Sequence, residues 1–235
     1  MLTITTISTG ATSLFFFIAG ASMYFSWRKK KNDLLKFFII FLISFSVQQM
    51  FLSLGSGLFS KDPTTSNWLW WISHIFMFIA ISYFIRFPIK LRFPQKEKLI
   101  FKLAISYSII GIAILFYNIS IVEPFLLDNG VYNWKVPPIA GATIGIFTTI
   151  CLLASFGIFI AEGRRVGKKI LKLRAWLIAA GILIFLIGGP MHNFVKTPTL
   201  NFLADFSLVF GVFLMVLGIY TSKFIELNKA HKREI

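Results

Sequence analysis

The chain has 235 residues, of which 57% are hydrophobic and only 14% are charged, and its formal net charge is +15. A soluble domain has about 25% charged residues. After folding, roughly a quarter to a third of the surface that its unfolded chain exposes is still in contact with water. Too few polar residues are present to cover that surface, so this composition excludes a soluble globular protein. The sequence therefore predicts an all-α integral membrane protein whose main partner is the lipid bilayer.

Seven apolar segments are long enough to cross a bilayer as helices, since a crossing needs about 20 mainly apolar residues. In chain order they lie near residues 5–27, 35–59, 67–87, 99–122, 138–162, 173–194 and 201–224. An odd number of crossings places the two termini on opposite sides of the membrane. The loops are short, so we predict a single domain over residues 1–235, a bundle of seven transmembrane helices.

The basic residues lie almost entirely on one side of this arrangement. Of the 24 Lys and Arg residues, all except Lys61, Lys135 and Lys196 fall on the side of the C-terminus, including the tail from Lys223. Because positively charged loops stay in the cytosol, the N-terminus is expected outside and the C-terminus in the cytosol, in the cytoplasmic membrane of a prokaryote. Topology explains the positive charge, so we expect no binding of nucleic acid.

The elements follow the same order in the two halves of the chain. In each half, two apolar spans flank a basic loop, and a short turn with Pro and Thr leads to a third span, as residues 64–73 and 198–207 show. This order predicts a 3+1+3 repeat of the kind that transporters use. The arrangement resembles that of the SWEET sugar transporters, but the spanning segments lack the proline-glutamine signature of that family, so no membership is assigned.

Ionisable and amide side chains gather in the half of the membrane that faces outside. Such groups are costly in hydrocarbon, by roughly 2.5 to 3.5 kcal/mol for charged ones, so each indicates a functional site. They are Gln48, Gln49, His74, His192, Asn201 and Asp205. Helical spacing adds Trp71 on the face of His74 and Gly188 on the face of His192. The run Gly188-Gly189-Pro190 predicts a bend or an unwound turn before His192, which Asp205 is expected to orient.

Two histidines facing each other predict, first, a b-type haem for electron transfer or sensing. His74 and His192 would be the axial ligands of the haem iron, with Gly188 making room for the macrocycle. A second possibility is a metal ion bound by His74, His192 and Asp205, because imidazole and carboxylate are ligands of zinc and iron. Both readings require the two histidines to share one site.

The alternative is a small-molecule transporter or a seven-helix receptor with an outward-facing cavity. In that case the ligand would be bound, or its binding coupled to a proton, by the polar side chains of this layer. These are Gln48, Gln49, Trp71, Asn201 and Asp205. In a third reading the protein is a structural membrane subunit, whose polar groups only join neighbouring helices. Catalysis is not indicated, because the sequence has no hydrolase or phosphate-loop motif. The sequence does not indicate the ligand, partner subunits or the oligomeric state.

Overall fold

The computed structural model describes residues 3–192 and 196–231, and their side chains except those of Lys30 and residues 222–231. Within this part of the chain, seven helices are long and apolar enough to cross a membrane, as predicted. They are α1 (Ile4–Lys30), α2 (Asp33–Ser56), α3 (Pro63–Arg92), α4 (Glu97–Tyr117), α5 (Pro138–Arg165), α6 (Lys169–Met191) and α7 (Pro198–His231). The protein is an integral membrane protein built as a helical bundle.

The helices begin where the sequence supplies caps. Thr3, Asn32 and Asp62 precede α1, α2 and α3, and each side chain accepts a hydrogen bond from a backbone N–H of the first turn, which satisfies one of the donors that a helix start leaves free. Pro138 opens α5, where the missing N–H costs nothing. Local signals therefore fix most starts to within a few residues of the predicted spans.

The end of α6 shows no unwound turn, one of the two predicted outcomes. The helix continues through Gly188, Gly189 and Pro190 to Met191 without an unwound turn. A proline removes the hydrogen bond of its own N–H and crowds the carbonyl of residue i−4, but Pro190 lies in the last turn of α6, where few helical hydrogen bonds remain to be disrupted. Positions 193 and 194 of the predicted span, and the side chains of the basic tail from Lys223, lie outside what the structure describes.

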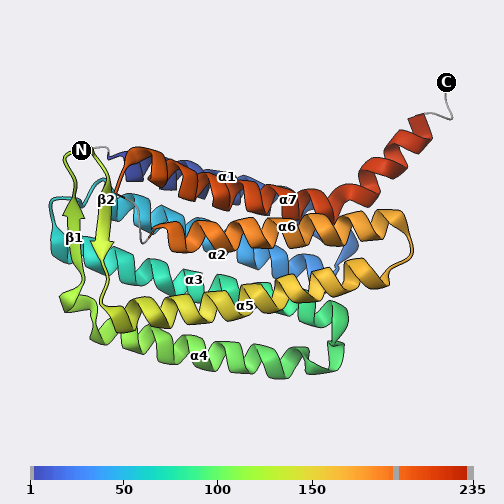
Figure 1. The fold of residues 1–235 in the computed structure, drawn as a ribbon, viewed down its shortest axis with the longest axis horizontal. Coiled ribbons are helices and arrows are strands. Elements are labelled where there is room, and N and C mark those ends of the chain that lie inside the picture. The colour runs from blue at the N-terminus through green and yellow to red at the C-terminus, as the bar shows by residue number, and fades with distance from the viewer. Residues whose placement is uncertain (1–2, 193–195, 232–235) are drawn as a thin grey trace.

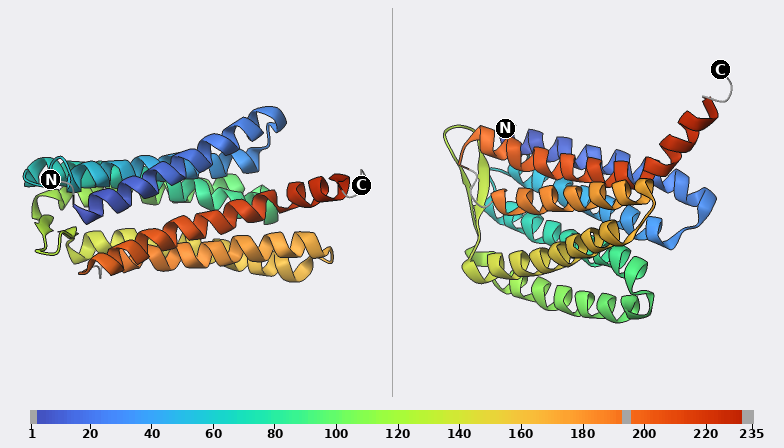
Figure 2. Two further views of the ribbon diagram at one scale, coloured as in Figure 1. Left: turned by 90° about the horizontal axis from the view of Figure 1, so that it is seen from above. Right: turned by 45° about the vertical axis from the view of Figure 1, so that its right-hand side comes forward.

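The helices run side by side along the long axis of the molecule, and α4 lies at the edge of the bundle, against α3 and α5 (Figure 1). Seen from above, α1, α2 and α3 form one layer, and α5, α6 and α7 form a second (Figure 2). The layers meet where α1 packs on α7 and α3 packs on α5. The arrangement leaves α2 and α6 on opposite sides of the space between the layers.

The connection between α4 and α5 is a β-hairpin, which the sequence analysis did not predict. After a short 3-10 turn (Ile119–Ile121), β1 (Glu123–Leu126) pairs antiparallel with β2 (Tyr132–Lys135). The turn contains Asn129 and Gly130, and the φ of Gly130 is +81°, a backbone conformation that glycine adopts without strain. The hairpin lies across one end of the bundle (Figure 1), which is called the hairpin end below.

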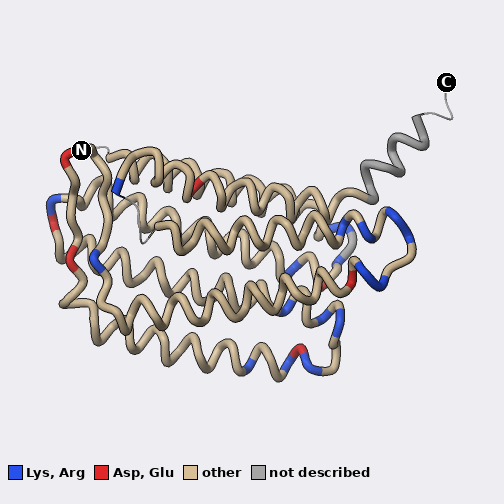
Figure 3. Tube along the Cα trace, in the orientation of Figure 1, with Lys and Arg blue, Asp and Glu red and all other residues tan. Residues whose placement is uncertain are grey.

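The opposite end, called the basic end, carries most of the Lys and Arg residues (Figure 3). Acidic residues at this end pair with basic residues from the last turns of α3. The pairs are Asp33 with Lys90 (2.9 Å), Glu97 with Arg86, and Glu162 with Arg92 (3.1 Å). Through them, α3 is joined to α2, α4 and α5.

Arg86 is the most enclosed of these cations. Its guanidinium carbon lies 4.0 Å from the ring centres of both Phe37 and Phe101, and its partner Glu97 is only 4% exposed. A guanidinium between two aromatic faces gains cation-π attraction in addition to its ion pair. At the junction of α2, α3 and α4, Arg86 is therefore enclosed and paired with Glu97.

Candidate ligand-binding pocket

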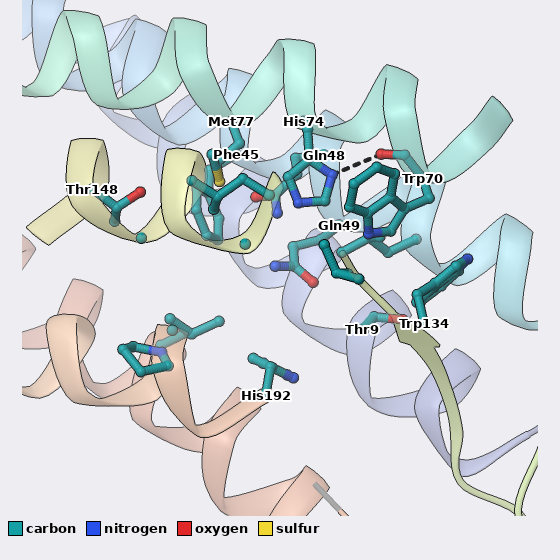
Figure 4. Close-up of a pocket in the computed structure, with 18 of the residues that line it drawn as sticks. Thr9, Phe45, Gln48, Gln49, Trp70, His74, Met77, Trp134, Thr148 and His192 are labelled. Atoms are coloured by element: carbon teal, nitrogen blue, oxygen red, sulfur yellow. Dashed lines mark hydrogen bonds between the residues drawn. The ribbon is translucent and has the colours of Figure 1, made fainter. Parts of the chain in front are cut away.

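A cavity of about 200 Å³ lies between the two layers at the hairpin end. Helices α1, α2, α3, α5, α6 and α7 and the hairpin all contribute to its wall, and Figure 4 shows part of it. Most lining side chains are apolar, among them Phe45, Trp70, Met77 and Phe185, and the described lining contains no Lys, Arg, Asp or Glu. Because an unpaired charge is very costly to bury, such a wall suits an uncharged molecule.

His74 reaches this wall from α3 and is 8% exposed. Its Nδ1 lies 2.7 Å from the carbonyl oxygen of Trp70 (Figure 4), and the two rings are 4.3 Å apart. A carbonyl oxygen only accepts hydrogen bonds, so Nδ1 carries a proton, and Nε2 of the neutral ring is an acceptor. The backbone of α3 thus fixes both the orientation and the tautomer of His74.

Gln48 and Gln49 bring two buried amides to the cavity from α2. Their exposed fractions are 6% and 2%, and their carbonyl oxygens have no hydrogen-bond partner among the described residues. The same holds for Nε1 of Trp134 in β2 and Oγ1 of Thr148 in α5, which also line the cavity. A buried polar group without a partner costs about 1–3 kcal/mol, and a ligand that bonds to it recovers this cost.

His192 lies at the end of α6, beside Asp205 of α7. Its Nε2 is 3.3 Å from Oδ1 of Asp205, and Oδ2 of the same carboxylate accepts a hydrogen bond from Nδ2 of Asn201 (3.3 Å). The amide of Asn201 also donates to Oγ of Ser8 on α1 (2.5 Å). His192 and Asn201 line the cavity. Asp205 is 3% exposed and lies behind them, so this carboxylate contacts these two residues and not the cavity.

The hairpin closes the cavity at the end of the bundle. Thr5 Oγ1 donates to the carbonyl oxygen of Tyr132 (2.9 Å) and lies 3.0 Å from its N–H, and the Tyr132 hydroxyl is 2.8 Å from Oγ of Ser66. Burial raises the pKa of Tyr132 above its usual 10.0, so the hydroxyl keeps its proton. Asn133 donates to the carbonyl oxygen of His192 (3.2 Å). These bonds join the hairpin to α1, α3 and α6.

Two residues of the predicted site lie away from the cavity. Trp71 donates from Nε1 to a carbonyl oxygen of α4 (3.3 Å), and its neighbour Trp70 takes the position on the wall. A Cβ on Gly188 would lie 3.0 Å from a carbonyl oxygen of α7, so this glycine brings α6 close to α7 and makes no room for a macrocycle. Gly189 lines the cavity instead, with open space where a Cβ would be.

The predicted metal site is not assembled. Among the described residues, no group of three or more His, Cys, Asp and Glu side chains is placed to hold a metal ion. Asp205 contacts His192, but His74 reaches the cavity separately, from α3 (Figure 4). The prediction placed three ligands at one depth in the membrane, and equal depth does not bring side chains on three helices together.

The comparisons with known proteins give no family for this chain. No protein-family model matches the sequence, and no curated protein is similar to it.

Proposed function

We propose that the protein binds a small uncharged molecule in the cavity at the hairpin end and acts as a carrier or a receptor for it. The supporting observation is that unpartnered polar atoms of Gln48, Gln49, Trp134 and Thr148 lie in the wall of one cavity. They comprise acceptors, an N–H donor and a hydroxyl, so a ligand with both a donor and an acceptor would bond to them. A purely structural bundle would gain stability by pairing or replacing these groups.

We propose further that the hairpin end faces the outside and the basic end the cytosol of a prokaryotic cytoplasmic membrane. Support comes from the gathering of Lys and Arg at the basic end (Figure 3), because positively charged segments are retained in the cytosol. The 3+1+3 repeat also stays a prediction. It is in keeping with a cavity flanked by α1–α3 on one side and α5–α7 on the other.

Haem binding, the sharper reading of the two histidines, is less favoured by this geometry. A cavity of about 200 Å³ is only somewhat larger than the roughly 150 Å³ that accommodates benzene, and haem has several times as many atoms. Nε2 of His192 also lies 3.3 Å from Oδ1 of Asp205. An absorption spectrum of protein expressed with added haem should show no Soret band before or after dithionite. A band that disappears in His74→Ala and in His192→Ala would establish haem instead.

Binding of benzamide tests the proposed pocket, because this uncharged molecule has an amide donor, a carbonyl acceptor and an apolar ring. We would titrate benzamide, toluene and benzoate into protein in lipid nanodiscs and follow the ligands by saturation-transfer NMR. Benzamide should bind more tightly than toluene, and benzoate should not bind, since the wall offers no cation. The double variant Gln48→Leu/Gln49→Leu should lower the affinity for benzamide about tenfold, which corresponds to the loss of two hydrogen bonds. Its affinity for toluene should be unchanged.

Gln95→Leu is the matched control, because Gln95 is an exposed amide at the basic end. This variant should bind benzamide as the unmodified protein does. Equal binding of benzamide by the double variant and the control would show that the two amides do not contact the ligand. Absence of benzamide and toluene binding in every form would contradict the pocket itself.

A further inference from the structure

Helices α5 and α6 are close together at the basic end and separate toward the hairpin end (Figure 1). Near the basic end, a Cβ on Gly163 would lie 3.2 Å from Nε1 of Trp176, so the two helices are packed there. Near the hairpin end, Gly141 and Gly145 of α5 and Gly189 of α6 have no atom within 4 Å of the place where a Cβ would be. All three glycines line the cavity.

Exposure of the lining residues shows where the cavity opens. Among the described residues that line it, Gly145, Gly189 and Pro190 are exposed, and all others are buried or half-buried. On the far side, Gln49 and Asn201 are each 2% exposed. The exposed part of the wall therefore lies between α5 and α6, and the opening faces sideways from the bundle.

The depth of this opening places it in lipid. Gly145 lies two turns after Pro138, about 10 Å along α5 at 1.5 Å per residue, and the hydrocarbon core is about 30 Å thick. The neighbouring exposed side chains Ile146, Ile150 and Ile187 are apolar. A molecule that passes this opening comes from the bilayer and not from water.

The spacing of Gly141 and Gly145 has a second interpretation, because two small residues four positions apart often pack against another membrane helix. Such a helix would cover the opening but would not reach the buried carbonyl oxygens of Gln48 and Gln49, which have no partner among the described residues. These oxygens lie within the cavity wall and require a donor that enters it. A ligand accounts for both observations.

We infer that the ligand enters sideways from the membrane between α5 and α6, and that it is a lipid-soluble uncharged molecule with a hydroxyl or amide at one end. The polar end bonds to Gln48 and Gln49, and the apolar part passes along Gly145 and Gly189 and extends through the opening into the lipid, because a cavity of about 200 Å³ holds only one end of a long chain. This inference rests on the proposed function, because it names the class of ligand and the route to the same cavity.

A photoreactive lipid tests the route directly. A long-chain fatty alcohol carrying a diazirine would be incorporated in nanodisc lipid, activated by light after increasing times, and its adducts located by mass spectrometry. In the unmodified protein, we expect adducts on cavity residues such as Thr148 and Leu186. Gly145→Leu and Gly189→Leu fill the opening and should slow the labelling of these residues about tenfold.

Gly157→Leu is the matched control, because Gly157 is exposed on the same helix and also has open space at its Cβ position, but it does not line the cavity. It should leave the labelling rate unchanged. Measuring benzamide binding in the same nanodiscs separates the two proposals, since benzamide tests the cavity and the fatty alcohol tests the route.

Several results would overturn the inference. If benzamide binds and the fatty alcohol labels only the lipid-facing surface, the cavity stands and the lipid route is wrong. Unchanged labelling rates in both filled variants would likewise exclude this opening. Disulfide-linked dimers of Gly145→Cys, made with Cys151→Ala, would show that a helix of a second copy occupies the opening. If neither probe reaches the cavity, both proposals fail.

Discussion

The two ends of the bundle differ in whether their buried polar groups have partners. At the basic end, Asp33, Glu97 and Glu162 each have a basic partner on α3. At the hairpin end, the buried amides of Gln48 and Gln49 reach a cavity with their carbonyl oxygens unpaired. The basic end therefore pairs charged side chains with each other, whereas the cavity wall holds neutral polar groups without a partner among the described residues.

This difference separates the part of the bundle that stabilises the fold from the part that we propose binds a ligand. In lipid, apolar contact between helices gains little over contact with lipid tails, so close packing and polar contacts hold the helices together. The basic end supplies these contacts through α3, and α6 and α7 add a glycine contact, where a Cβ on Gly181 would lie 2.4 Å from the Gly211 carbonyl oxygen. The hairpin end keeps polar groups free at a cost in stability.

The largest effect should come from breaking the most enclosed pair of the basic end. Arg86→Met keeps the apolar stem but leaves Glu97 buried and without a partner, and such a loss costs about 3–5 kcal/mol. SDS titration in mixed micelles would measure the free energy of unfolding. Lys90→Met is the control, because its partner Asp33 has a side chain that is 61% exposed, and exposed pairs contribute about 0–1 kcal/mol. If both variants lost the same free energy of unfolding, the enclosed pair would contribute no more to stability than the exposed one.

Removing the unpaired amides should stabilise the protein. Gln48→Leu/Gln49→Leu replaces two unsatisfied buried groups with apolar ones of similar size, and the free energy of unfolding should rise by roughly 1 kcal/mol. The same titration measures it, with Gln95→Leu as the unchanged control. A fall of similar size would mean that the amides hold helices together, as in a structural subunit.

The smallest effect concerns Asp62, the cap of α3 at the hairpin end. The hydroxyl of Thr65 (2.6 Å) and the Thr65 backbone N–H lower the pKa of Asp62 below its usual 3.8. A lowered pKa stabilises the folded protein above pH 3.8, and this contribution disappears as the pH falls through the lowered value. Thermal midpoints measured across this range should therefore fall only in acid.

Asp62→Asn isolates this contribution, because asparagine also caps a helix but does not titrate. The variant should show a smaller fall of the thermal midpoint below pH 3.8 than the unmodified protein. An identical acid response in both proteins would assign the fall to other carboxylates.

The helices and the depth of the polar layer could be predicted from the sequence, but the rotation of each helix could not. Length and hydropathy determine where a segment crosses the membrane, and so His74, His192, Gln48, Gln49 and Asn201 were placed in one layer. Successive residues of a helix are about 100° apart. An error of one position therefore exchanges Trp71 for Trp70 and Gly188 for Gly189, and only packing decides between them.

The hairpin and two of the polar groups in the cavity wall were missed for other reasons. Asn129-Gly130 is a strong hairpin signal, but it lies in a segment read as a loop between two helices. A tryptophan near the end of a membrane crossing, such as Trp134, is typical of an interfacial aromatic belt, and Thr148 resembles any threonine that bonds to its own helix. What singles out both is the absence of a partner, and this property exists only in three dimensions.

The hairpin also imposes an order on the making of the cavity. During synthesis, Thr5 emerges early, and Tyr132 can bind it as soon as the hairpin forms. The hydrogen bond from Asn133 to His192 can form only after α6 has been made, and Asn201 is added to the wall with α7, the last helix. The amides of α2 gain an opposite wall as α5, α6 and α7 follow, so the cavity is completed only when the final transmembrane segment has been inserted.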